Sequence, residues 1–294
     1  PKLEIIDTEN NPAYFLPNEK KIFIENKTIK LFSNDSNFND IIAYLISHEL
    51  AHHYLNHGWM KNVGFGYTST IGNFLIDENN LNQKKIDETQ ADIFGGFFAK
   101  ISGYDALNNG EKCLRTIYTE YNINENIRGY PSLDERVEII NSNIEKTNKL
   151  ADIFYLGNLS LVIGEYEIAN NCYVEILNNN FSSREIFNNI GTIHLLKSID
   201  ILNPNQSKFI FPVFIEFNTR ADNRLKRNTD NQNIIEHLDR AKSYFEKSLS
   251  KDKNYKSAKI NLIVVDFIEK LINNSLNKNY YENLIKKKYI DEKR

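Results

Sequence analysis

The residues best suited to chemistry are His48, Glu49 and His52, in the pattern His-Glu-Leu-Ala-His. Apolar residues recur at three-to-four spacing around them, which predicts an amphipathic helix over about residues 39–58. Residues four apart share one helix face, so both imidazoles can reach one metal ion, while Glu49 can reach a water on that metal. Neutral imidazole suits Zn²⁺, and a site with three protein ligands leaves a position for water, whose pKa the metal lowers.

A third ligand is expected on the next predicted helix, over about residues 84–101. Glu88 and Asp92 are four residues apart on it and therefore share a face. The small residues Ala91 and Gly95 would let this helix pack closely on the first. A carboxylate ligand, with a second carboxylate one turn on that holds a ligand histidine, is a common supporting arrangement for zinc.

Two other histidines, His53 and His57, are alternative third ligands because they lie close in sequence. Both are rotated away from the helix edge that carries His48 and His52, which makes them weaker candidates than Glu88. His57, near the predicted helix end, is better placed to cap the C-terminus or to face solvent.

Short strands and further helices should position these residues. β-branched and aromatic residues predict strands at 3–6 and 22–32, around turns at 9–12 and 17–20. Helices are predicted over about 106–121 and 133–150, a loop or irregular short helix over 62–82, and a loop over 122–131.

The pattern changes after residue 150 and becomes repetitive. Leu156, Gly157, Gly164, Tyr166, Ala169 and Tyr173 fall at tetratricopeptide (TPR) positions, and Gly191 stands 34 residues after Gly157. The next small and aromatic signals, Ala241 and Phe245, come about one repeat late, which indicates an insertion near 201–234. A third repeat starts at Tyr255, with its second helix around 279–289. The second half thus resembles the TPR family.

The insertion contains an apolar run at residues 209–217. It is interpreted as a strand or plug that packs on the rest of the protein. The alternative is a segment that lies near the active site or offers an edge to a partner.

Composition and charge exclude several classes of protein. The 294 residues include 36 Lys and Arg against 39 Asp and Glu, without the basic field that nucleic-acid binding needs. No apolar stretch has the length of a transmembrane segment, and two cysteines make neither a disulfide framework nor a cysteine zinc site. The expected protein is soluble, α+β and mainly helical. It would have a compact metal domain with a small β-sheet at 1–150 and an all-α TPR solenoid at 151–294.

The motifs of the first domain resemble the HtpX, Oma and CAAX-prenyl endopeptidase family of zinc metallopeptidases (Ste-type, HExxH gluzincins). In that family E-x-x-A-D follows HExxH on the next helix. Residues 11–17, Asn-Pro-Ala-Tyr-Phe-Leu-Pro, are similar to its N-A-(F/Y)-x-L-P segment, which leads into an edge strand, expected here at 21–24. Residues 131–136, Pro-Ser-Leu-Asp-Glu-Arg, resemble its H-P-x-x-x-E-R. The resemblance covers about residues 3–145, and some members carry a C-terminal TPR domain.

The resemblance implies a role for each residue of the site. The implied ligands of one Zn²⁺ per chain are His48, His52 and Glu88. Glu49 would be the general base, Asp92 would support a ligand histidine, and Arg136 would brace the site by pairing with a carboxylate. Tyr130 stands where the family often has His and is the candidate oxyanion donor, the alternative being a packed aromatic residue. Substrate is expected to pair as a strand along residues 21–25.

Two hypotheses of different class follow. The first is a zinc-dependent endopeptidase of protein or peptide substrates, whose TPR domain recruits or gates them. A zymogen-like state, in which the insertion or the 62–82 loop blocks the cleft, is compatible with it. The second is a TPR adaptor or chaperone with an inactive or regulatory zinc domain. Glu49 favours the first, because a structural zinc site needs no base.

The compartment stays open at this point. The family resemblance favours the periplasm or cell envelope of a bacterium, and the cytoplasm is the alternative. Because the sequence begins at Pro1, a trimmed initiator Met and a missing leader or upstream segment are both compatible with it.

Overall fold

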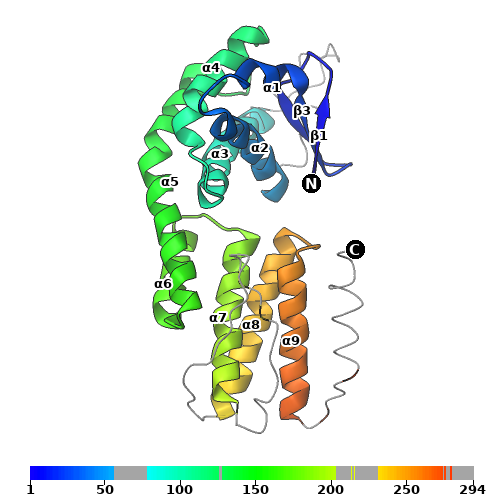
Figure 1. Ribbon diagram of the computed structural model, residues 1–294, viewed down its shortest axis with the longest axis vertical. Coiled ribbons are helices and arrows are strands. Elements are labelled where there is room, and N and C mark those ends of the chain that lie inside the picture. Colours follow the sequence, from blue (N-terminus) through cyan, green and yellow to red (C-terminus); the bar gives the residue numbers. More distant parts are fainter. Residues whose placement is uncertain are drawn as a thin grey trace. The chain divides into compact units, whose positions relative to one another are not determined.

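The computed structural model describes residues 1–55, 78–125, 128–202 and 231–273, together with 213, 215, 275 and 279. The chain divides into two compact units, Pro1–Asp152 and Ile153–Arg294. The described residues form many helices and one three-stranded sheet (Figure 1), so the prediction of a mainly helical α+β protein is confirmed. No helix among them is both long and apolar enough to cross a membrane.

The strands all belong to the first unit: β1 (Lys2–Ile6), β2 (Ala13–Leu16) and β3 (Lys21–Glu25). Its helices are α1 (Asn26–Phe32), α2 (Phe38–Tyr54), α3 (Glu78–Ile101), the short 3₁₀ helix η1 (Leu107–Asn109) and α4 (Gly110–Glu120). α5 (Leu133–Val162) begins in the first unit and ends in the second. The second unit continues with α6 (Tyr166–Asn178), α7 (Arg184–Ile201), α8 (Asn231–Lys251) and α9 (Lys256–Ile272).

The sheet order corrects two expectations about β3. The order is β1-β3-β2, with β1 parallel and β2 antiparallel to β3. The prediction of an edge strand at residues 21–24 is therefore wrong, because β3 has a strand on each side. The strand also does not continue to residue 32, because α1 begins at Asn26. Thr28 and Phe32, four residues apart, are the buried residues of α1, so this stretch packs with a helical period.

Glu25 ends β3 and holds the N-terminal loop that leads into β2. Its carboxylate is fully buried and accepts four hydrogen bonds. The donors are Thr8 Oγ1 (2.6 Å), Asn10 N (2.9 Å), Asn11 N (2.8 Å) and the Tyr121 hydroxyl (3.0 Å). A buried carboxylate needs such donors, so this one side chain fixes the course of the loop before β2.

The helices that carry the metal motif cross at Gly95. A Cβ at this position would lie 2.8 Å from the backbone N of His48 and 2.9 Å from its Cα. Only glycine permits this approach, because a backbone cannot move aside as a side chain can. α3 begins at Glu78, earlier than predicted, and residues 62–77 of the expected loop lie outside the described residues.

The hydrophobic core of the first unit packs against α2, the helix that carries His48 and His52. Its buried apolar residues include Ile41, Tyr44 and Leu45 of α2, Leu114 and Ile117 of α4, and Ile140 of α5. Because α2 contributes to this core on one side and carries the histidines beside it, the core fixes the position of the motif.

The second unit repeats one kind of helix contact. A Cβ at Gly157 of α5 would lie 3.0 Å from Cys172 and Tyr173 of α6, and a Cβ at Gly191 of α7 would lie 2.7 Å from the Phe245 ring of α8. The glycine and the aromatic residue are 16 positions apart in the first contact and 54 in the second. Similar helix pairs are thus joined by connections of very different length.

Other predictions for this unit are only partly addressed. α5 runs through residue 150 without a break, so no separate helix begins there. The apolar run at 209–217 and the helix predicted at 279–289 lie outside the described residues, apart from positions 213, 215 and 279. The TPR solenoid and the division into a peptidase domain and a repeat domain stay predictions.

Candidate metal centre

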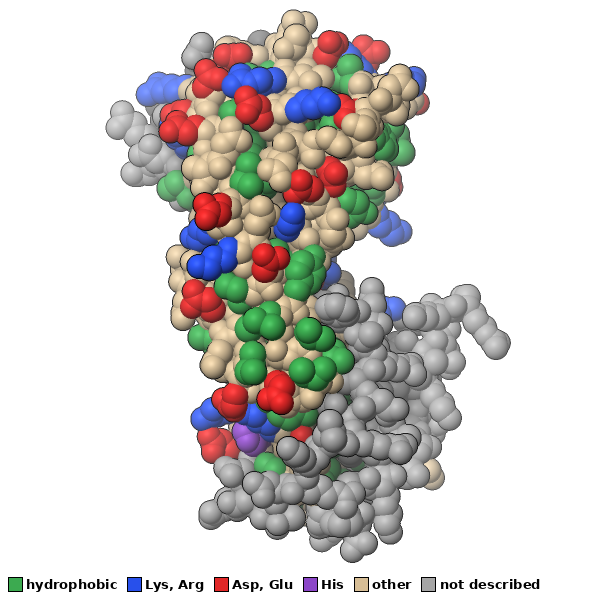
Figure 2. Space-filling view, turned by 60° about the vertical axis from the view of Figure 1, so that its left-hand side comes forward, with side chains coloured by type: hydrophobic (Ala, Val, Ile, Leu, Met, Phe, Trp, Pro, Cys, Tyr) green, Lys and Arg blue, Asp and Glu red, His purple; other side chains and the backbone are tan. Residues whose placement is uncertain are grey.

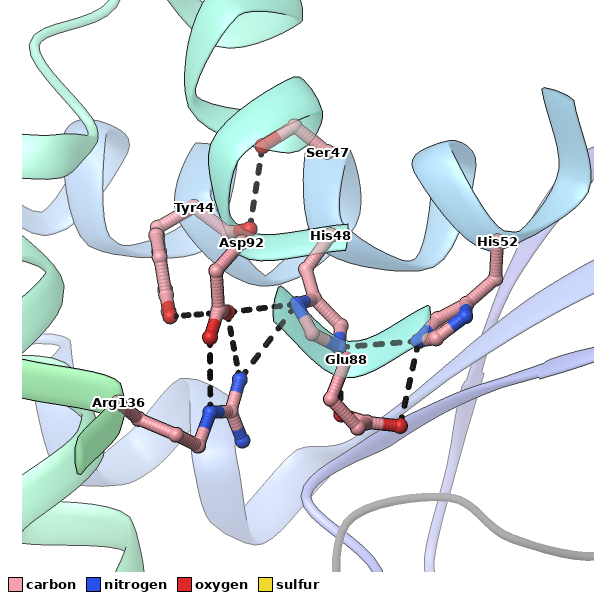
Figure 3. Close-up of polar contacts among 7 residues, drawn as sticks. All are labelled: Tyr44, Ser47, His48, His52, Glu88, Asp92 and Arg136. Carbon is pink, nitrogen blue, oxygen red and sulfur yellow. Dashed lines mark hydrogen bonds and ion pairs between the residues drawn. The ribbon is translucent and has the colours of Figure 1, made fainter. Parts of the chain in front are cut away.

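Three side chains from α2 and α3 converge on one point (Figure 3). His52 Nε2 lies 3.1 Å from His48 Nε2, and the two Glu88 oxygens lie 3.4 Å from His48 Nε2 and 3.6 Å from His52 Nε2. All three residues are at most 6% exposed. One ligand atom from each lies within 4.8 Å of the others, so this buried cluster could hold a metal ion.

Asp92 sets the orientation and tautomer of His48. Its Oδ1 lies 2.9 Å from His48 Nδ1, so the imidazole donates its Nδ1–H to the carboxylate. In the neutral imidazole the lone pair of His48 is then on Nε2, the atom that faces His52 and Glu88. This is the arrangement in which an outer carboxylate prepares a histidine to bind a metal.

Asp92 is itself held by two further side chains. Arg136 of α5 donates from Nε to Oδ2 (2.9 Å) and from Nη2 to Oδ1 (2.6 Å), and the Tyr44 hydroxyl donates to Oδ1 (2.7 Å). All three residues are buried. The sequence suggested Arg136 through a motif, whereas nothing in the sequence pointed to Tyr44, which lies one helical turn before His48.

The cluster concentrates negative charge in the interior. Burial opposes ionisation of Glu88, but the hydrogen bond from His48 and nearby positive charges outweigh it and lower the pKa of Glu88 to about 2. Burial likewise opposes ionisation of Asp92, while Arg136 and His48 hold its pKa well below the usual range. Burial disfavours a charged His48, but Asp92 and Glu88 raise its pKa to about 9. Two carboxylates against one guanidinium therefore attract a further positive charge, whether a proton or a metal cation.

Glu49 lies beside this cluster and touches the sheet. Burial raises its pKa to about 7, with His48 lowering and Glu88 raising it. The Phe15 backbone N–H donates to its carboxylate. Glu49 is 4% exposed, so it is a buried acid close to the ligand histidines rather than a solvated surface residue.

Tyr130 lies on the α3 side of the site. Its hydroxyl is buried and has no hydrogen-bond partner within the described part of the chain. Burial, and then the charges of Glu88 and Asp87, raise the pKa of Tyr130 well above its usual range. Lys84 Nζ lies 5.5 Å from the centre of its ring. The hydroxyl thus stays protonated and can donate a hydrogen bond.

The two weaker ligand candidates do not join the cluster. The His53 ring packs against Phe15, with 5.1 Å between ring centres, and against Tyr54, with 5.0 Å. His57 lies outside the described residues.

Comparison with known proteins adds no relative. A scan of protein-family models and searches of curated proteins and of solved structures found no match to this chain. The resemblance to the zinc metallopeptidase family therefore stays a prediction that depends on the motifs.

Proposed function

We propose that this chain is a zinc-dependent endopeptidase that hydrolyses peptide bonds of protein or peptide substrates, with a TPR-like second unit that recruits or gates them. One observation carries the proposal: His48, His52 and Glu88 converge in the interior, and the buried carboxylate of Glu49 interacts electrostatically with His48 and Glu88. Structural zinc sites usually have four protein ligands and no adjacent base, whereas hydrolytic sites have three ligands and a base.

The donor set and its spacing suit zinc. Donors on a tetrahedron with bonds of about 2.0–2.1 Å lie about 3.3 Å apart. The contacts between the three side chains, 3.1, 3.4 and 3.6 Å, bracket that distance. Mg²⁺ and Ca²⁺ prefer all-oxygen ligands, so two imidazoles favour a transition metal or zinc.

The chemistry divides between the ion and the chain. When bound, Zn²⁺ supplies Lewis-acid polarisation of the scissile carbonyl and lowers the pKa of a water. Glu49 accepts the proton of the attacking water and delivers it to the leaving amine. Asp92 and Arg136 keep His48 in the tautomer that presents Nε2 to the ion.

Tyr130 is the proposed donor to the substrate oxygen on which negative charge develops. Its buried hydroxyl lacks a hydrogen-bond partner among the described residues, and its proton is held firmly. Buried polar groups are normally paired, so a hydroxyl in this state is suited to a partner that arrives with the substrate.

Substrate backbone is proposed to pair with β2, in place of residues 21–25. Among the described residues β2 pairs only with β3 and is an edge of the sheet. Glu25 N donates to Pro12 O, so in this register the backbone groups of Ala13 and Phe15 point away from β3. Phe15 N–H donates to Glu49 there, which puts this edge next to the proposed base and leaves the outward Phe15 carbonyl as an acceptor for the substrate.

The test is cleavage by wild-type protein and by Glu49→Gln. Both are loaded with one equivalent of zinc and incubated with a library of unmodified peptides, and new termini are identified by mass spectrometry. Glu49→Gln should cut about 10²–10⁴-fold more slowly, the usual contribution of a general base. Glu138→Gln, which changes an exposed carboxyl of the same unit, should cut at the wild-type rate.

Two outcomes would contradict the proposal. Equal cleavage by Glu49→Gln would remove Glu49 as the base. Zinc-loaded wild-type protein that cuts no peptide in the library, while it retains zinc, would favour the adaptor with an inactive zinc domain.

A further inference from the structure

The second unit carries a ridge of exposed aliphatic side chains. Leu156 and Leu159 of α5 and Ile163, the residue directly after its end, are spaced i, i+3 and i+7 and are 51%, 58% and 55% exposed. Val162 beside them is 40% exposed, and Ile168 of α6 is 48% exposed. Figure 2 shows hydrophobic side chains gathered on the face that α5 and α6 turn toward the viewer. We call these five residues the α5 ridge.

The ridge is unusual in both charge and size. Residues 153–163 contain no charged side chain. Half-exposed Leu, Ile and Val residues at five neighbouring positions leave on the order of 500 Å² of apolar surface open, the size at which patches on soluble proteins mark interaction sites. Single exposed aliphatic residues need no explanation, but a continuous set on one helix face does.

We propose that a second copy of this chain covers the α5 ridge, in a two-fold dimer with the two α5 ends antiparallel. In that arrangement Leu159 lies next to its own copy at the symmetry axis, and Leu156 packs against Ile163 of the other chain. A two-fold interface is self-complementary, so Leu156, Leu159 and Ile163 of the ridge supply both of its sides. Ridges spaced i, i+3 and i+7 interdigitate when helices pack.

The apolar area of the α5 ridge is large enough for a dimer interface. Two ridges would bury about 1,000 Å², and their polar rims would bring the interface to about 1,200 Å², the lower end of the range for specific dimers. A helix of another protein would need a groove to lie in. Leu156, Leu159 and Ile163 follow one helical face in an uncharged stretch, and an identical ridge lying beside it matches both the spacing and the lack of charge.

The test is the molar mass of the full chain in solution as a function of concentration, by analytical ultracentrifugation. An interface of this size predicts a monomer–dimer equilibrium in the micromolar range, with dimer dominant by about 200 μM. Leu159→Glu should be monomeric throughout, because it places two like charges together at the axis. Ile235→Glu, which changes an aliphatic residue of α8 that is 60% exposed, should dimerise like wild type.

Two variants with opposite charges at position 159 test the two-fold arrangement separately from folding. Leu159→Lys and Leu159→Glu should each be monomeric, and a mixture of the two should form a heterodimer with wild-type circular dichroism, because the opposite charges then meet at the axis. A wild-type chain that stays monomeric at about 200 μM would overturn the proposal and assign the ridge to a different partner. Dimers of Leu159→Glu, or no heterodimer in the mixture, would overturn the two-fold arrangement.

Discussion

Both units of this chain bury polar side chains where helices meet closely at a glycine, but they satisfy those side chains differently. In the first unit, around the α2–α3 crossing at Gly95, two imidazoles and a carboxylate point their ligand atoms at one another. In the second unit, around Gly191, buried amides point at one another and pair donor to acceptor.

The amide network of the second unit pairs donors with acceptors among the described residues. Asn158 Oδ1 accepts from the Tyr173 hydroxyl (2.6 Å) and from Asn189 Nδ2 (2.9 Å). Asn188 Nδ2 donates to Asn189 Oδ1 (3.3 Å), and Asn261 Nδ2 donates to Asn188 Oδ1 (3.0 Å). These hydrogen bonds link α5, α6, α7 and α9 through neutral groups, so the network stabilises the helix packing and needs no ligand.

The difference separates a functional site from a structural one. Neutral amides have both donors and acceptors, so they can satisfy each other. Two imidazole nitrogens and a carboxylate carry one negative charge and can all accept, so they are held together by a proton, as in the hydrogen bond from His48 to Glu88, or by a cation. Ligand atoms that converge on one point, where a proton or a cation must hold them together, are therefore the sign of a metal site, and four predictions test that contrast.

The largest difference is expected for zinc affinity. His52→Ala removes a ligand and should weaken zinc binding by more than about 10²-fold, beyond the usual loss for an outer residue. Asn189→Ala should leave zinc affinity unchanged and destabilise the second unit by about 1–3 kcal/mol, because Asn158 and Asn188 lose a partner. Competition with a zinc chelator and urea denaturation measure the two effects. Equal zinc loss in both variants would contradict the contrast.

A large effect on stability is expected at Arg136. Arg136→Met leaves Asp92 as a buried charge without its main partner and should cost about 3–5 kcal/mol. Arg184, in the second unit, also pairs with an aspartate, Asp252, but both side chains are more than one-fifth exposed. Arg184→Met should therefore cost at most about 1 kcal/mol. If urea denaturation showed similar losses of unfolding free energy in the two variants, burial would not explain the different strengths expected for these two ion pairs.

Substitutions of the two glycines should differ less in their cost to stability than substitutions of the two arginines. Gly95→Ala drives a methyl group into the His48 backbone and should cost about 2–3 kcal/mol while weakening zinc binding. Gly191→Ala meets the Phe245 ring, which can tilt, and alanine also favours the helix, so the net cost should be about 1 kcal/mol. Thermal unfolding and chelator competition measure both, and zinc loss in Gly191→Ala would be the contrary result.

The smallest effect is a pH dependence of the second unit. His194 Nδ1 lies 3.1 Å from His237 Nδ1, and burial, then His237 and nearby cations, lower the pKa of His194 to about 4. Between about pH 6.5 and pH 4 the unfolded chain binds the proton and the folded chain does not, so stability falls as pH falls, by about 1 kcal/mol. His194→Gln should flatten this part of the profile in denaturant titrations. An unchanged profile would exclude His194 as the cause.

The sequence was most informative where spacing along one helix decided the geometry. His48 and His52, and Glu88 and Asp92, are pairs four residues apart, and each pair lies on one helix face in the structure. Gly95 was expected to allow a close crossing, and its position against the His48 backbone shows how close it is. In these cases local periodicity carries the three-dimensional information.

The sequence was least informative where partners are far apart in the chain. The strand β2 went unpredicted because its four residues gain their pairing from β3, and because Glu25 orders the loop before it from a distance of 14 to 17 residues. Tyr44 has the pattern of a core residue, and only its hydrogen bond to Asp92, 48 residues away, shows its place in the site. Long-range pairing of this kind leaves no local signal.

The most direct measurement is the zinc content of the purified chain after dialysis against a weak chelator, by elemental mass spectrometry. We expect one zinc per chain in wild type and in Glu49→Gln, and little or none in His52→Ala and Glu88→Ala. Wild-type protein that cannot be loaded with zinc, or full zinc retention without His52 and Glu88, would contradict the claim that this cluster is a zinc site.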